Sequence, residues 1–180
     1  MATATKIIFS GFGGQGVLTL GQVVADIALN QGKEVTWMPS YGAEMRGGTA
    51  NCSVIISDSV IGSPIILRNI DILVAMNKPS IDKFLEKTSE DSKVFINSSI
   101  VTDPVEKAGA EVLAIDATNI AVSAGNARAA NMVMMAGFLT KTGLFTIDEL
   151  EQALTRRFAG KKELVDVNMK AVKQGLEALA

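Results

Sequence analysis

The chain has 180 residues, with 17 basic and 19 acidic side chains and a formal charge of −2. Hydrophobic residues make up 48% of it, which excludes intrinsic disorder and predicts one domain with a substantial core. The mixed charges leave no basic footprint for nucleic acid. Histidine is absent and Cys52 is the single cysteine, which excludes His-dependent triads, an intramolecular disulfide and Cys/His zinc or iron–sulfur sites. We expect no catalytic residue and no metal ligand set in this chain.

The first part of the chain reads as strand, glycine loop, helix and strand. A buried strand is expected at 6–10, a tight loop at 11–16, and a helix from Val17 to about Gly32. A second strand follows at 34–38. This order is a Rossmann-like βαβ opening. It predicts an α/β fold: a single domain over residues 1–180 with an open, mostly parallel sheet and helices on both faces.

The remaining pattern continues this alternation. Residues 39–50 are expected to form a long ordered loop, because they combine three glycines and a proline with conspicuous polar side chains. Strands are expected at 51–57, with a short return hairpin at 60–61, and at 71–76, 93–96 and 111–115. Helices are expected at 79–87, 117–123, 129–141 and 163–179. One more helix is expected to begin at a capping box formed by Thr146 and Glu149. Met132, Met134 and Met135 are expected to pack in the core, with an adaptable subunit interface as the alternative.

The glycine loop satisfies a G-x-G-x-x-G spacing at Gly11, Gly13 and Gly16. Its position between a strand and a helix favours binding of an anion, because glycines let the backbone approach and helix N-terminal amides face the ligand. Three readings stay open: a nicotinamide dinucleotide, another anion or cofactor, or close packing alone. The acid that would hold a ribose is out of place, since Glu34 opens the second strand instead of closing it.

A second motif gives the sequence a family resemblance. Gly-Phe-Gly-Gly-Gln-Gly at 11–16, followed by Ser-Tyr-Gly-Ala-Glu-Met-Arg-Gly-Gly-Thr at 40–49, resembles the gamma subunit of 2-oxoacid:ferredoxin oxidoreductases. The resemblance continues in Ile-Ile-Ser-Asp at 55–58, Ser-Pro at 63–64, Asp-Ile-Leu-Val-Ala-Met at 71–76 and Ala-Asn-Met-Val-Met-Met-Ala-Gly at 130–137. It covers most of the chain and suits a free-standing gamma subunit.

The resemblance implies an accessory subunit of an oxidoreductase complex. Such complexes decarboxylate a 2-oxoacid on thiamine diphosphate and Mg, pass electrons through iron–sulfur clusters to ferredoxin, and transfer the acyl group to coenzyme A. The partners implied are alpha and beta subunits that hold thiamine diphosphate and a ferredoxin-like delta subunit. We expect no cofactor to be bound by this chain alone. The resemblance favours 2-oxoglutarate as substrate, with branched-chain (2-oxoisovalerate) and indolepyruvate members as alternatives.

The expected site residues belong to the two glycine-rich motifs and to the polar positions beside the 129–141 helix. We expect both loops to meet at the C-terminal edge of the sheet, with Arg46 available to a phosphate or carboxylate. Asn126 is expected to cap the apolar helix, and the resemblance places Asn131 near the loops. The candidate contacts are Gly13, Gly14, Gln15, Gly16, Tyr41, Glu44, Arg46, Gly47, Asn126 and Asn131. The alternative for Glu44 and Arg46 is an ordinary exposed ion pair.

Two other functional classes predict different behaviour. A stand-alone oxidoreductase would bind a nicotinamide cofactor, and a pure scaffold subunit would affect activity only through assembly. No targeting segment and no apolar stretch of ~18 residues are visible, so we expect a cytoplasmic protein that does not contact the membrane. Cys52 is expected to be a small buried hydrophobe, and the isolated chain is expected to tolerate self-association as a dimer.

Overall fold

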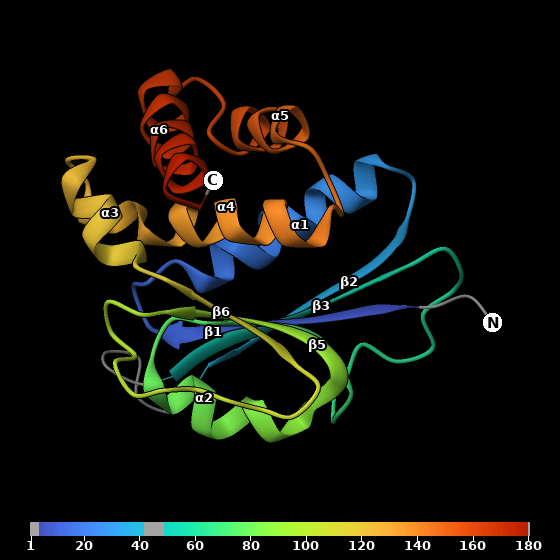
Figure 1. Cartoon of the computed structure of the whole chain (residues 1–180). Coiled ribbons are helices and arrows are strands. Elements are labelled where there is room, and N and C mark those ends of the chain that lie inside the picture. Colours follow the sequence, from blue (N-terminus) through green and yellow to red (C-terminus); the bar gives the residue numbers. More distant parts are fainter. Residues whose placement is uncertain (1–3, 42–48, 180) are drawn as a thin grey trace.

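The computed structural model describes residues 4–41 and 49–179 (Figure 1). The strands are β1 (Thr5–Phe12), β2 (Glu34–Tyr41), β3 (Thr49–Ser57), β4 (Ile70–Ala75), β5 (Thr88–Asn97) and β6 (Glu111–Ile115). The helices are α1 (Val17–Asn30), α2 (Lys78–Phe84), α3 (Ala117–Ser123), α4 (Ala130–Thr142), α5 (Ile147–Arg157) and α6 (Lys162–Leu179). Two 3-10 turns, η1 (Leu85–Lys87) and η2 (Ala127–Ala129), precede β5 and α4.

The strands of the described ranges form one sheet in the order β2-β3-β1-β4-β5-β6. Strands β1, β4, β5 and β6 are parallel, while β3 is antiparallel to both β1 and β2. The mostly parallel α/β sheet is therefore confirmed. The βαβ opening differs from its simplest form, because β3 lies between β1 and β2. The return strand β3 occupies the place beside β1 that a plain crossover would have given to β2.

Helices cover both faces of the sheet (Figure 1). Helices α1 and α4 lie on one face, α2 lies on the other, and α5 and α6 form a further layer over α1 and α4. Strand β1 serves both layers: Ile7 and Phe9 join the core beneath α1 and α4, whereas Ile8 joins the core beneath α2. Burial on both faces explains why these strands read as continuous apolar runs and not as alternating ones.

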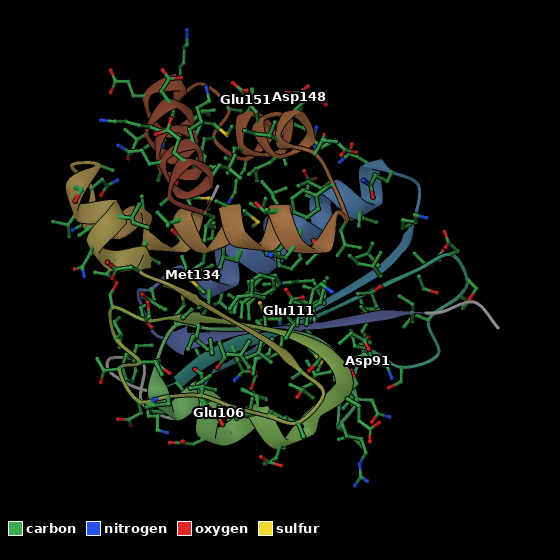
Figure 2. The ribbon with its side chains drawn as sticks, in the orientation of Figure 1. Asp91, Glu106, Glu111, Met134, Asp148 and Glu151 are labelled. Carbon is green, nitrogen blue, oxygen red and sulfur yellow. The ribbon has the colours of Figure 1, made fainter. Side chains whose placement is uncertain are left out.

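Residues 130–139 of helix α4 are all buried, because the helix lies between the sheet and α6. Its methionines Met132, Met134 and Met135 are at most 1% exposed, which confirms the expected packing role; Met134 is labelled in Figure 2. Phe138 on the same helix is in ring contact with other phenylalanines at centroid distances of 5.7–6.0 Å. At Gly175 on α6, an added Cβ would lie 2.7 Å from Ala136 Cβ, so a glycine lets these two helices touch.

The predicted capping box at the start of α5 is present. Thr146 Oγ1 accepts from the amide of Glu149, and the Thr146 amide donates to Glu149 Oε2 at 2.7 Å. A hydrogen bond from Gln31 at the end of α1, together with those from Thr146, holds the pKa of the Glu149 carboxyl below its ordinary value. The cap therefore also joins α5 to α1.

Several predicted boundaries are wrong. Residues 39–41 and 49–50, expected in a loop, belong to β2 and β3; Pro39 is tolerated because β2 is an edge strand. Residues 60–61 do not form a return hairpin. Strand β5 begins at Thr88 instead of 93, through a polar segment that the apolar pattern missed and that carries a register irregularity opposite Ile70.

No helix in the described ranges is long and apolar enough to cross a membrane.

Candidate functional site

The glycine loop follows β1 at the C-terminal edge of the parallel strands. Its turn is closed by the Gln15 amide, which donates to the Phe12 carbonyl at 3.1 Å. The Gln15 side chain reinforces it: Oε1 accepts from the Phe12 amide at 2.6 Å, and Nε2 donates to the Met76 carbonyl after β4 at 3.4 Å. Gln15 thus holds the loop against the neighbouring strand.

Glycine is required here by backbone conformation and by space. Gly14 has φ 96° and Gly16 has φ 74°, in the left-handed region. A Cβ at Gly16 would collide with the Asn131 amide, and one at Gly11 would lie 2.7 Å from Gln15 Oε1. Around Gly14, by contrast, no heavy atom that the structure describes lies within 4 Å of the added position. The loop is therefore tightly packed at both ends and open at its tip.

The N-terminus of α1 begins directly behind this open tip. Gly16 is the N-cap, and among the described residues no side chain caps the helix. The first turn of α1 also lacks an acidic residue. Uncapped amides at a helix N-terminus carry partial positive charge and suit an anion. The geometry of the loop is therefore compatible with the binding of an anion.

Asn131 ties the distant helix α4 to the glycine loop. Its Nδ2 donates to the Gly16 carbonyl at 3.3 Å, its Oδ1 accepts from the Met132 amide, and the residue is 7% exposed. Asn126 has a different position: its side chain accepts from the Arg128 amide at 3.1 Å and caps η2, the turn that runs into α4. The structure therefore places Asn131, but not Asn126, in hydrogen-bond contact with the loop.

The second glycine-rich motif is only partly described. Glu44, Arg46 and Gly47 lie outside the described residues, and of Tyr41 only the backbone position is described. That position closes β2 opposite Ala50, while Thr49 opens β3 opposite Phe12. The two ends of the motif therefore lie at the same sheet edge as the glycine loop.

Two buried asparagines at this edge were missed from the sequence. Asn77 is the second residue after β4, and Asn97 is the last residue of β5. Both are 0% exposed. Asn77 Oδ1 accepts from the amide and hydroxyl of Ser80, and Asn97 Nδ2 donates to Thr118 Oγ1. Each keeps one polar atom without a partner in the described part of the chain. An asparagine after a buried apolar strand was the signal that could have found them.

The nicotinamide interpretation loses support from the same geometry. Glu34 is the first residue of β2 and pairs with Ser57 at the sheet edge opposite the glycine loop. A ribose-binding acid ordinarily lies at the end of the strand that follows the first helix, next to β1. Here β3 separates β2 from β1, so an acidic residue on β2 would not lie beside the glycine loop in that way.

Cys52 is a buried side chain beneath α1. It is 0% exposed, its Sγ lies 3.6 Å from the Val17 carbonyl, and burial raises the pKa of the thiol to about 12. This matches the expected small hydrophobe. Within the described ranges no three His, Cys, Asp or Glu side chains gather as a metal site.

These features define a class: an α/β domain with an uncapped, glycine-loop helix N-terminus at the C-terminal edge of its sheet. The profile of the pyruvate ferredoxin/flavodoxin oxidoreductase family matches residues 6–178, and the chain belongs to this family. The ketoisovalerate oxidoreductase subunit VorA of Methanothermobacter thermautotrophicus is 37% identical over 174 residues, covering 96% of this chain but 36% of VorA. The 2-oxoglutarate synthase subunit KorC of Methanocaldococcus jannaschii is 32% identical over 152 residues, covering 83% of this chain and 81% of KorC.

A solved structure shows the same fold. The gamma subunit of a keto/oxoacid ferredoxin oxidoreductase from Geobacter sulfurreducens superposes with a TM-score of 0.81 at 30% identity, covering 96% of each chain. The resemblance to gamma subunits seen in the sequence is thereby confirmed. The chain spans about a third of the length of the VorA proteins that it matches.

Proposed function

We propose that the chain is the gamma subunit of a multi-subunit 2-oxoacid:ferredoxin oxidoreductase. Family membership and the gamma-subunit fold support this assignment. In the overall reaction the carboxyl carbon of the 2-oxoacid leaves as CO₂ and the acyl group joins the sulfur of coenzyme A. The thiol proton is released, and two electrons pass to ferredoxin.

The chain's own residues fit an accessory role. Its single cysteine is buried, so an iron–sulfur cluster requires cysteines of partner subunits. We assign thiamine diphosphate, Mg and the clusters to the alpha, beta and delta partners. What this chain offers is backbone donors: the amides of the glycine loop and of the first turn of α1, held in place by Gln15 and Asn131.

The observation that carries the site proposal is the uncapped N-terminus of α1 behind the open loop tip at Gly14. Such a terminus suits a phosphate group of coenzyme A. The described ends of the second motif close β2 and open β3 at this edge. We propose that Glu44, Arg46 and Gly47, which lie between those ends in the sequence, complete the contact. The same loops would brace the subunit that binds thiamine diphosphate.

The substrate is a 2-oxoacid whose identity the relatives leave between ketoisovalerate, 2-oxoglutarate and pyruvate. The sequence resemblance favours 2-oxoglutarate. The match to VorA has a higher identity than the match to KorC (37% against 32%) and covers more of this chain (96% against 83%). This favours a branched-chain 2-oxoacid as the second candidate. A panel of 2-oxoacids assayed with the purified complex would decide between them.

The test of the site uses the complex purified through a tag on this chain and assayed anaerobically for ferredoxin reduction dependent on coenzyme A. Gly14→Asp places a carboxylate at the open loop tip, and we expect KM for coenzyme A to rise about tenfold with little change in kcat. Gly143→Asp is the matched control, because Gly143 also has a positive φ (62°) and open surroundings among the described atoms.

The other outcomes separate the competing functions. Lower complex yield with an unchanged KM for coenzyme A would assign the loop to scaffolding. Recovery of the chain without oxidoreductase subunits, together with nicotinamide cofactor binding measured by calorimetry, would replace the proposal with a stand-alone dehydrogenase.

A further inference from the structure

Arg128 is an exposed cation at the start of the helical segment that runs into α4. It lies in η2, where the Asn126 side chain accepts from the Arg128 amide at 3.1 Å, and η2 continues directly into α4 at Ala130. The residue is exposed, and none of the ion pairs formed within residues 4–41 and 49–179 includes it. Its positive charge is therefore not neutralised by a described carboxylate.

The position of this arginine is unfavourable for the helix itself. The first N–H groups of a helix carry partial positive charge, so cations stabilise helix C-termini and destabilise N-termini. Lys141, in the last turn of α4, follows this rule, whereas Arg128, in the first turn of the continuous segment 127–142, does not. Helix stability therefore does not account for an arginine at this position.

Arg128 lies beside the glycine loop because Asn131 ties this end of α4 to Gly16. Asn131 Nδ2 donates to the Gly16 carbonyl at 3.3 Å, and Gly16 is the N-cap of α1. Residues three apart in a helical segment lie on the same face, so Arg128 is the neighbour of Asn131 one turn nearer the start of the segment. Figure 1 shows the turn before α4 beside the connection from β1 to α1. The N-termini of two helical segments thus meet at one place.

Asn131 also offers a buried donor at this place. The residue is 7% exposed, and an added Cβ on Gly16 would collide with its Nδ2. A side-chain amide nitrogen has two N–H groups to donate. Among the described residues Nδ2 has only the Gly16 carbonyl as acceptor, so its second N–H has no partner there. A buried donor of this kind at the uncapped end of α1 indicates an acceptor supplied by a ligand.

The charges at this place fit a phosphate monoester better than a diphosphate. The N-terminus of α1, which has no acidic residue in its first turn, contributes about +0.5 elementary charge, and Arg128 contributes about +1. A phosphate monoester carries about −1.5 to −2 at pH 7 on one phosphorus centre. A diphosphate that links two groups spreads its charge over two centres. The planar fork of an arginine also pairs with two oxygens of one phosphate group.

We infer that Arg128 and Asn131 are the residues by which the glycine-loop site selects the phosphate monoester of coenzyme A, at the 3′ position of its ribose. This inference rests on the proposed function and adds to it the group of the ligand that occupies the site. The amides of α1 and Asn131 Nδ2 donate to the phosphate oxygens, and the exposed guanidinium of Arg128 pairs with the same group. A thiol that lacks this phosphate has no contact with Arg128.

The test measures KM for coenzyme A and for 3′-dephospho-coenzyme A, which lacks only this phosphate, with the complex purified through a tag on this chain. Arg128→Ala should raise KM for coenzyme A about tenfold with kcat unchanged, because a charge-assisted hydrogen bond is lost. The same variant should change KM for 3′-dephospho-coenzyme A by less than about twofold. Arg128→Lys should fall between wild type and Arg128→Ala, since an ammonium keeps the charge but not the fork.

Arg157→Ala is the matched control. Arg157 is also an exposed arginine outside the ion pairs of the described ranges, but it lies at the end of α5. Its substitution should leave both KM values unchanged. Arg128→Ala should also keep or raise the Tm of the chain, because the arginine opposes the dipole of its own helix. A purely structural role for Arg128 predicts a lower Tm instead.

The remaining outcomes separate this assignment from the proposed site. An equal rise in KM for both thiols in Arg128→Ala would refute the assignment of Arg128 to the 3′-phosphate. An unchanged KM for coenzyme A in Arg128→Ala, with a raised KM in Gly14→Asp, would refute the role of Arg128 and leave the glycine-loop site standing. An unchanged KM for coenzyme A in both variants would overturn the site and the assignment together.

Discussion

The contact between Gly16 and Asn131 allows a quantitative test of how the glycine loop is held. Gly16→Ala introduces two separate penalties. The φ of 74° costs a residue with a Cβ about 1–2 kcal/mol, and the new methyl collides with the Asn131 amide. Moving Asn131 breaks its bond to the Gly16 carbonyl, which is worth about 1 kcal/mol because that carbonyl also accepts from Leu20. We expect a total loss of about 2–3 kcal/mol in the free energy of unfolding.

The assay is urea unfolding followed by circular dichroism, with Gly14→Ala as the control. Gly14 has φ 96° but open space around it among the described atoms, so its substitution should cost only the backbone term of about 1–2 kcal/mol. Combining Gly16→Ala with Asn131→Ala should show a coupling of about 1 kcal/mol, since the second change removes the collision. Equal losses for Gly14→Ala and Gly16→Ala, with no coupling to Asn131, would refute the reasoning.

Three further changes test the core, the thiol and the helix cap. Phe138→Ala should destabilise the fold by about 3–5 kcal/mol in urea unfolding, because its ring is 1% exposed and meets three other phenylalanines. Thr146→Ala should lower the free energy of unfolding by about 1 kcal/mol through loss of the capping box. Burial raises the pKa of Cys52 from 9.0 to about 12, so its contribution to stability is complete below pH 9 and is lost as the pH rises toward 12. Relative to Cys52→Ala, the wild type should lose up to about 1.4 kcal/mol per pH unit in that range, measured by urea unfolding at pH 8, 9.5 and 10.5.

Each of these three predictions has an outcome that would contradict it. Phe158→Ala should cost less than Phe138→Ala, because Phe158 is only half-buried; the reverse order would contradict the position of α4 in the core. Thr155→Ala, at an exposed position in the last turn of α5, should stay within about 0.5 kcal/mol of wild type, so an equal loss there would refute the cap. Parallel pH profiles of wild type and Cys52→Ala would contradict the burial of the thiol.

The sequence predicted the elements that depend on local pattern. Continuous apolar runs marked the buried strands, and Thr146 with Glu149 marked the start of α5, because a capping box is a contact between near neighbours. The sequence pattern was less successful where polar residues continue a strand. Strand β5 starts at Thr88 because this residue pairs with Ile70 on β4, and the polar residues after it carry no apolar signal. The 60–61 hairpin failed because two apolar residues carry no information about pairing.

The residues of the candidate site also fall into those that local sequence pattern predicted and those that only the tertiary structure placed. Local spacing was enough to place Gly13, Gly14, Gln15 and Gly16 between a strand and a helix, and to give Asn126 a capping role. Only the tertiary structure joined Asn131 to Gly16, across 115 residues of sequence, and placed Asn77 and Asn97 at the same edge. Such neighbours depend on strand order and helix packing, which periodicity does not encode.

By itself, then, the sequence determined the α/β class, the family and the residues of the glycine loop, since these follow from local pattern and motif. The tertiary structure alone decided that β3 lies between β1 and β2, which places both ends of the second motif beside the glycine loop. It alone showed that the helical segment carrying Arg128 meets the N-terminus of α1, through Asn131 and Gly16. The physical reason is that such contacts depend on which distant surfaces meet, and an arginine has the same letter on an open surface and beside a binding site.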